Sequence, residues 1–254
     1  MTLSLSDHHI TRLTLLDLGL FDVGPGLRRI GIPGYLLETD GGARILLDTG
    51  FPPDYVTAPA ATAARDDLAR FGALIDHSAT RTVPGQLALL GLTTADITHV
   101  ILSHGHIDHV GALPLFAHCE VILTETERAD PRPCYFYDKR PMEWPIATYR
   151  LITGETDLCH GLRLIPTPGH TAGHLSALVT LPGGSFVLAI DAINRASEPA
   201  EGFADAKDPA MAAQSAARLF ALQHHHKAQM IYGHDPDQWA LLPKAPQPLI
   251  PWPR

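Results

Sequence analysis

The segment SHGHIDH at residues 103–109 holds four potential metal ligands, three His and one Asp, within six residues. It follows the apolar run THVIL, which is typical of a buried strand, and a turn at a strand end can bring together side chains that a regular element keeps apart. Neutral imidazole nitrogen and anionic carboxylate oxygen suit zinc or a neighbouring first-row metal. A catalytic zinc needs only three protein ligands and a water, so we expect this segment to serve two ions.

Two ions need further ligands, and three candidates come after other predicted strands. His170 comes shortly after the run LRLIP, Asp191 follows FVLAI and His234 follows AQMIYG. Any one of these residues alone is typical of an ordinary turn. Together with the first segment they favour a metal site, because His106 and Asp108 would be costly to bury without a charged partner.

Short apolar runs separated by Gly, Pro and Asp recur along the whole chain. Stretches 51–97 and 126–160 are the least patterned, and we expect them to hold substrate-contacting loops. Alternation of strands and helices predicts an α/β (α+β) layered fold. The predicted elements are strands at 98–104, 120–125, 162–167, 185–191 and 228–234, a hairpin of 35–39 and 43–50 around residues 40–42, and helices at 59–71, 84–91 and 209–227.

The domain organisation follows from the length and from the absence of a linker. A chain of 254 residues can bury one sizeable core. No repeat and no Gly- or Ser-rich stretch divides it, so we expect residues 1–254 to form a single domain, that of a hydrolase. The last part, 243–254, carries five prolines and predicts an extended surface strap without a regular element.

Composition narrows the classes of function. The formal net charge of −8 leaves no large basic surface, so we expect no nucleic-acid or anionic-lipid partner. No apolar run approaches the roughly 18–20 residues of a membrane-spanning helix, and the start MTLSLSDHHITR does not resemble a signal peptide. The three cysteines lie far apart and form no CxxC motif, which favours a reducing compartment. We therefore expect a cytoplasmic protein that acts on a small molecule.

The order of these motifs resembles that of the metallo-β-lactamase superfamily. HGHIDH, then TPGH, then an Asp that ends a strand and a His that ends a later strand all match its pattern, and so does LLDTG at 46–50. A closer resemblance is to its N-acyl-homoserine-lactone lactonase branch. It is carried by TGFPPDY (49–55), LLGLTTADITHVILSH (89–104), TPGHTAGHLSALVTLP (167–182) and YGHDPDQW (232–239).

The resemblance implies a four-layer αββα sandwich with two metal ions at one edge, between the sheets. It also implies that Asp191 bridges the ions together with a water or hydroxide. Asp48 would orient the ligand loop, since metal-bound imidazoles usually donate their second nitrogen to such a group; a turn-initiating Asp is the alternative. The implied ligands are His104, His106 and His170 for one ion, and Asp108, His109 and His234 for the other.

The resemblance to the lactonase branch implies a hydrolase that opens a lactone ring. Two divalent ions lower the pKa of a shared water from about 15.7 towards about 7, and the resulting hydroxide can attack the lactone carbonyl. Asp108 could then relay a proton to the leaving alkoxide. N-acyl-homoserine lactones are the expected substrate, which would make the activity quorum quenching. Zinc is the expected metal, with cobalt, manganese and iron as alternatives. The sequence leaves open whether two copies pair as a homodimer.

One position departs from the lactonase pattern. Enzymes of this branch usually carry a Tyr three residues after the bridging Asp, where it contacts the substrate carbonyl. Here that position is Asn194, which can still donate a hydrogen bond but is shorter and less acidic. Either another donor replaces the Tyr, or the substrate is a different lactone.

The remaining candidates are aromatic residues and competing hydrolase classes. Phe21, Tyr137 and Trp144 could line an acyl pocket together with Asn194, although aromatic residues are core residues by default. Hydrolysis of another lactone or ester is one alternative. A glyoxalase II-like thioesterase uses the same ligands, but that group resembles a two-part protein with a helical C-terminal domain, whereas this chain ends in a Pro-rich strap. A metal-stabilised binding or sensor protein is the alternative outside enzymology.

Overall fold

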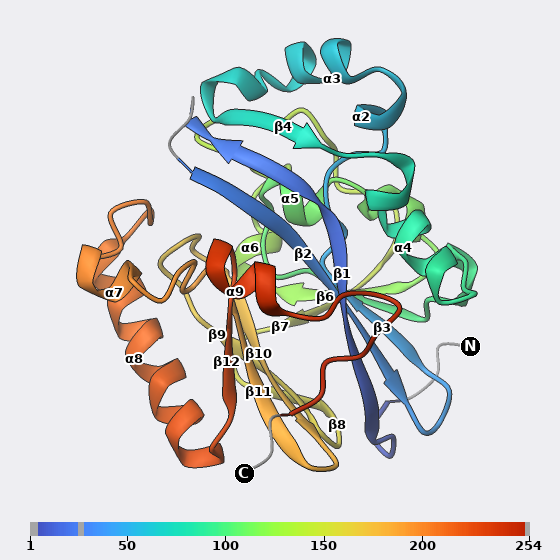
Figure 1. The fold of residues 1–254 in the computed structure, drawn as a ribbon, viewed down its shortest axis with the longest axis vertical. Helices are drawn as coiled ribbons and strands as arrows, with labels where there is room; N and C mark the ends of the chain where they lie inside the picture. Colours follow the sequence, from blue (N-terminus) through green and yellow to red (C-terminus); the bar gives the residue numbers. More distant parts are fainter. Residues whose placement is uncertain (1–4, 25–27, 252–254) are drawn as a thin grey trace.

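Two β-sheets face each other in the computed structural model, which describes residues 5–24 and 28–251 (Figure 1). The first sheet has the order β4-β1-β2-β3-β5-β6-β7 and the second has the order β12-β11-β10-β9-β8. The first contains β1 (Ile10–Val23), β2 (Arg28–Thr39), β3 (Arg44–Leu47), β4 (Gly72–Asp76), β5 (His99–Ile101), β6 (Glu120–Thr124) and β7 (Thr148–Ile152). The second contains β8 (Thr156–Cys159), β9 (Leu162–Pro166), β10 (Leu175–Leu181), β11 (Gly184–Ile190) and β12 (Gln229–Tyr232).

Helices cover the outer face of each sheet. In Figure 1 the longest helix, α8, runs beside the second sheet, and α2 to α4 lie over the first. The helices are α2 (Asp54–Thr57), α3 (Pro59–Asp66), α4 (Val83–Leu89), α5 (Ile107–Val110), α6 (Glu125–Arg128), α7 (Glu198–Glu201), α8 (Pro209–His226) and α9 (Pro236–Leu241). Short 3₁₀ turns occur at Leu68–Arg70, Ala79–Arg81, Thr94–Asp96 and Leu113–Phe116. No helix in the described ranges is long and apolar enough to cross a membrane.

Three apolar clusters lie between the layers and hold them together. Because side chains alternate across a strand, Leu37 of β2 enters the cluster between the sheets, while its neighbour Leu36 enters the cluster under α4 and α5. A third cluster joins the outer face of the second sheet to Leu219 of α8. All seven residues of β11 are buried, because both of its faces are covered. The αββα prediction is confirmed.

The predicted strands and the hairpin are confirmed in position, but two other predictions need correction. The helix expected over 59–71 ends at Asp66, because Asp67 takes a left-handed conformation with φ +56° and a 3₁₀ turn follows it. The stretch 126–160, expected to be irregular, contains β7 and β8. The sequence analysis also overlooked β1, whose alternation is interrupted by a register shift between Asp17 and Leu20.

The Pro-rich segment after α9 lies along β1. It has no regular element, as predicted, and hydrogen bonds tie it to the strand: the Ala245 N–H donates to Leu15 O and the Leu249 N–H to Leu13 O, both at 2.8 Å. The Leu249 side chain is 3% exposed and belongs to the cluster between the sheets. The segment is therefore anchored in the core and is not only a surface strap; residues 252–254 of the prediction lie outside the described residues.

We predict that Leu249→Ala lowers the free energy of unfolding by about 2–5 kcal/mol, because it leaves a cavity in the core between the sheets. Ile250→Ala is the matched control: Ile250 is the next residue and is 71% exposed, so we expect a change of at most about 0.5 kcal/mol. Urea unfolding at equal metal content measures both changes. Equal effects of the two substitutions would contradict the anchoring role of Leu249.

Candidate metal centre

Four strand ends meet at one edge of the sandwich. Strands β9 and β11 are both antiparallel to β10, and β12 is parallel to β11, so β9, β11 and β12 all run in the same direction. Their carboxyl ends lead to His170, Asp191 and His234, respectively. The loop after β5 in the opposite sheet holds residues 104–109. The topology therefore brings segments up to 130 residues apart (234 − 104) to one place.

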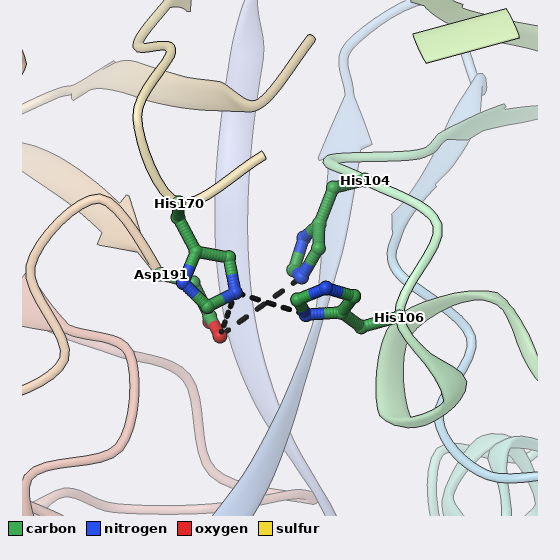
Figure 2. Close-up of side chains that lie close together, drawn as sticks. All are labelled: His104, His106, His170 and Asp191. Carbon is green, nitrogen blue, oxygen red and sulfur yellow. Dashed lines mark hydrogen bonds and ion pairs between the residues drawn. The ribbon is translucent and has the colours of Figure 1, made fainter. Parts of the chain in front are cut away.

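The first ligand set is His104, His106, His170 and Asp191, and the ligand atoms of this set lie within 4.8 Å of one another. Figure 2 shows His104 and His106 facing His170 and Asp191 from the opposite side. His170 Nε2 lies 2.9 Å from His106 Nδ1 and 3.2 Å from Asp191 Oδ2. His104 Nε2 lies 3.9 Å from the same carboxylate oxygen. These atoms surround a space that one ion could fill.

The second set is Asp108, His109 and His234. Asp108 Oδ2 lies 3.5 Å from Nε2 of each histidine. The other oxygen of Asp191, Oδ1, lies 3.4 Å from His109 Nε2 and 3.2 Å from His234 Nε2. Because its two oxygens face different sets, Asp191 stands between two candidate cation positions. All seven residues predicted as ligands are thus brought together.

Unpartnered buried atoms test whether these residues fit cations. His104 Nε2, His109 Nε2 and Asp191 Oδ1 are buried and have no hydrogen-bond partner among the described residues. Buried polar atoms are almost always paired, and imidazole nitrogen with carboxylate oxygen is a donor set for divalent first-row metals. The residues therefore fit two divalent cations.

Hydrogen bonds on the far side of three imidazoles set their tautomers. His234 Nδ1 lies 2.9 Å from the Gly31 carbonyl, which can only accept, so Nδ1 carries a proton and, in the neutral imidazole, the Nε2 lone pair faces the site. Likewise His109 Nδ1 lies 2.8 Å from Asp48 Oδ2. The Ser103 hydroxyl donates to Asp48 Oδ2 at 2.7 Å and lies 3.0 Å from His104 Nδ1. Asp48 thus occupies the orienting position that the resemblance implied.

His174 lies behind the ligands. It is buried, with Nδ1 2.8 Å from the Thr167 hydroxyl, and its Nε2 accepts the backbone N–H of Asp191 at 3.1 Å. Burial lowers its pKa well below the usual value, which keeps the imidazole neutral. His174 therefore positions the backbone of Asp191 and is outside both ligand sets.

The ionisation of the site matches a cation-binding role. Burial lowers the pKa of His104 well below its usual value and that of His106 to about 3, so these imidazoles stay neutral. Burial opposes ionisation of Asp191, but the surrounding imidazoles outweigh it and hold its pKa well below the usual range. The pKa values of His109 and His234 are raised, because nearby carboxylates outweigh the effect of burial. The pKa of Asp108 is lowered as well, so the carboxylates of Asp108 and Asp191 are ionised and attract positive charge.

Asn194 is held by a carboxylate that the sequence analysis missed. Its backbone N–H and its side-chain Nδ2 both donate to the buried Glu198, the latter at 3.2 Å. Its carbonyl accepts the His234 N–H at 2.9 Å. Burial raises the pKa of Glu198, against the effect of these hydrogen bonds. The only local signal was an acidic residue four positions after Asn194, at the start of α7.

The aromatic candidates differ in their surroundings, although Phe21 and Tyr137 both contact the ring of Phe71. Phe21 is buried and stacks between Phe51 and Phe71 at 5.6 and 5.4 Å. Trp144 donates its Nε1–H to Asp130 O and lies under the guanidinium of Arg128. Tyr137 is 68% exposed, with Arg70 over its ring. Their substrate contacts stay predictions.

Comparison with known proteins agrees with this geometry. The family model described as the metallo-beta-lactamase superfamily matches residues 29–234. The chain belongs to the metallo-beta-lactamase superfamily. N-acyl homoserine lactonase AiiA of Bacillus thuringiensis subsp. kurstaki is 32% identical over 212 residues, which cover 80% of this chain and 81% of that protein. N-acyl homoserine lactonase AttM of Rhizobium radiobacter is 33% identical over 179 residues, covering 64% and 67%.

A solved structure supports the same branch of the superfamily. It is an N-acyl homoserine lactone hydrolase with the product N-hexanoyl-L-homoserine bound at its catalytic metal centre. It is 25% identical to this chain, with a TM-score of 0.81, and the match covers 95% of this chain and 100% of that one. With the curated relatives, this likeness assigns the chain to the lactonase branch.

We predict that Asp48→Asn weakens metal binding about 10- to 100-fold, because His109 and Ser103 lose a charged acceptor. Asp48 has φ +64°, a conformation that Asn tolerates well, so the substitution changes the charge and leaves the backbone in place. Chelator competition on the purified variant measures the affinity. An affinity within about threefold of the unmodified protein would show that Asp48 does not orient the ligands.

Proposed function

We propose that this protein is a dinuclear metal hydrolase that opens lactone rings, with N-acyl homoserine lactones as its main substrates. The observation that carries the proposal is the position of Asp191, whose two oxygens face two separate sets of ligands. The lactonases named above, which match most of the chain, support the choice of substrate class.

In this proposal Asp191 would contact both ions. One ion would be held by His104, His106 and His170, and the other by Asp108, His109 and His234. Two divalent ions, when bound, supply a nucleophile from water at neutral pH and polarise the ester carbonyl. We propose zinc, because five imidazole nitrogens and two carboxylates match its usual donors. Cobalt, manganese and iron accept the same donors, so metal analysis of the purified protein distinguishes them.

Asp108 is the residue we propose for proton transfer. Opening a lactone releases an alkoxide, which needs a proton as the bond to the acyl carbon breaks. Asp108 Oδ2 faces the imidazoles of His109 and His234 at 3.5 Å each. Nearby imidazoles lower the pKa of Asp108 against the effect of burial, so the carboxylate would first accept the proton that the attacking water loses and then pass it to the leaving oxygen.

Asn194 is proposed to contact the substrate carbonyl in place of the usual Tyr. One amide hydrogen is donated to Glu198, which fixes the orientation of the side chain. An amide side chain has a second hydrogen and an oxygen, which in this proposal serve the substrate. The shorter side chain leaves more room than a Tyr, which favours a bulkier lactone or another ester as the second candidate substrate.

The site assignment is tested first by substrate turnover. We expect about two metal ions per chain and hydrolysis of N-acyl homoserine lactones in a panel that also holds other γ- and δ-lactones, a glutathione thioester and a β-lactam. His106→Ala and Asp191→Ala should lose metal and activity together. Turnover of the thioester alone would overturn the proposal, and so would full hydrolysis by either variant.

We predict that Asn194→Ala lowers kcat/KM for the preferred lactone roughly tenfold, the effect of losing one hydrogen bond in the transition state. The variant keeps the backbone N–H that donates to Glu198, so metal content should not change. Steady-state kinetics with metal analysis of the same samples measures both. An unchanged kcat/KM would remove Asn194 from the substrate site.

Three further proposals concern the whole chain. We propose one domain over residues 1–254, because the cluster between the sheets takes in residues from Leu5 to Leu249. A cytoplasmic location is supported by three cysteines that form no disulfide. The net charge of −8 favours a small-molecule partner over nucleic acid. Light scattering in solution decides whether a homodimer forms.

A further inference from the structure

A buried carboxylate outside both ligand sets lies between the two loops of the first set. Glu127 belongs to the short helix α6 and is buried. All hydrogen bonds described for its carboxylate are made with the loops that hold His104, His106 and His170. Its Oε1 accepts the N–H of Gly105 at 2.9 Å. Its Oε2 accepts the Thr171 hydroxyl at 2.8 Å and the Gly173 N–H at 3.1 Å. One carboxylate thus joins segments that are 66 residues apart (171 − 105).

The two loops carry three of the four ligands of the first set. Gly105 stands between His104 and His106, and Thr171 directly follows His170. Glu127 therefore accepts hydrogen bonds from the residues next to these ligands. Its Oε1 serves the loop of His104 and His106, and its Oε2 serves the loop of His170.

Local structure holds Glu127 in this place. The Thr124 hydroxyl caps α6 by accepting the Glu127 N–H at 3.1 Å, and the same hydroxyl donates to Gly173 O at 2.7 Å. A Cβ on Gly173 would come within 2.3 Å of Glu127 N. The second loop can approach α6 this closely only because residue 173 has no side chain.

The other ligands do not need this support. His109 and His104 are oriented through Asp48 and Ser103, and His234 through the Gly31 carbonyl. Within the described residues, the hydrogen bonds and ion pairs of the His106 and His170 ring nitrogens stay inside the ligand set. The direction of these two imidazoles must therefore come from their backbones, and Glu127 binds the backbone or side chain next to each.

We propose that Glu127 is the positioning residue of the first metal site: it sets the separation of His106 and His170 and so raises the affinity of that site for its ion. The proposal rests on the metal assignment under Proposed function. The proposed role requires the carboxylate of Glu127, because an ionised carboxylate can accept on both oxygens, whereas an amide has only one accepting atom.

Glu127→Gln tests the proposal. A glutamine oxygen can serve Gly105 or the pair Thr171 and Gly173, but the NH₂ group then faces an N–H or O–H donor on the other side. We expect zinc affinity of the first site to fall about 10- to 100-fold. Chelator competition on metal-free protein measures it, and faster hydrogen exchange of the Gly105 and Gly173 amides should accompany the loss. Glu125→Gln, an exposed acid on the same helix, should leave both readouts unchanged.

Single-site backgrounds separate the two ions. In His234→Ala, which keeps the first set whole, Glu127→Gln should weaken zinc binding; in His170→Ala, which keeps the second set whole, it should change binding by less than about threefold. Equal weakening in both backgrounds, or none in His234→Ala, would overturn the proposal.

Thr171→Val is a second test of the proposal that does not depend on the folding of the Glu127→Gln variant. It removes one neutral donor to Oε2 and no charge, so we expect a drop in first-site affinity of about 2- to 10-fold. An unchanged affinity would count against the positioning role of Glu127. If the unmodified protein bound no zinc, the metal assignment itself would fail, whereas normal zinc binding and lactone hydrolysis with an inert Glu127→Gln would refute only the role of Glu127.

Discussion

The carboxylate of Asp191 is where the two halves of the site meet. Its Oδ2 faces His170 and its Oδ1 faces His234, each at 3.2 Å. A carboxylate buried this deeply is stable only when positive charge or hydrogen-bond donors surround it. Five imidazoles, and the cations they fit, meet that need. The packing of two sheets, with four strand ends at one edge, can be understood as the means of gathering these groups around one carboxylate.

Several groups near Asp191 are held by residues outside the two ligand sets. Asp48 holds the 104–109 loop through Ser103 and His109, and His174 holds the backbone of Asp191 itself. Because these contacts are made by protein groups, the ligands have their directions before an ion arrives. Such preorganisation limits the rearrangement that binding requires and favours one coordination geometry.

The loops around Phe71 and Phe136 are held by a different kind of contact. The turns at 67–71 and 134–140 come from the two least patterned parts of the chain and meet through a stacked pair, Phe71 and Phe136, at 5.5 Å. Ion pairs flank the stack, with Lys139 3.0 Å from Asp67. Aromatic residues in this region consequently fill the core as well as shape the surface, which is why residue type alone separates the two roles poorly.

The sequence by itself predicted the seven candidate ligands and the strands that carry them, because a His- and Asp-rich segment directly after an apolar run depends only on local order. The alternation of strands and helices predicted a layered α/β fold, and the resemblance to the superfamily implied its αββα order. They did not reveal Glu127, Glu198 or the Gly31 carbonyl, or the long strand β1 with its register shift. Gly31 and His234 are 203 positions apart. Only the tertiary structure decides such partners, since a hydrogen bond depends on which atoms the folded chain brings within about 3 Å, and spacing along the sequence does not encode that distance.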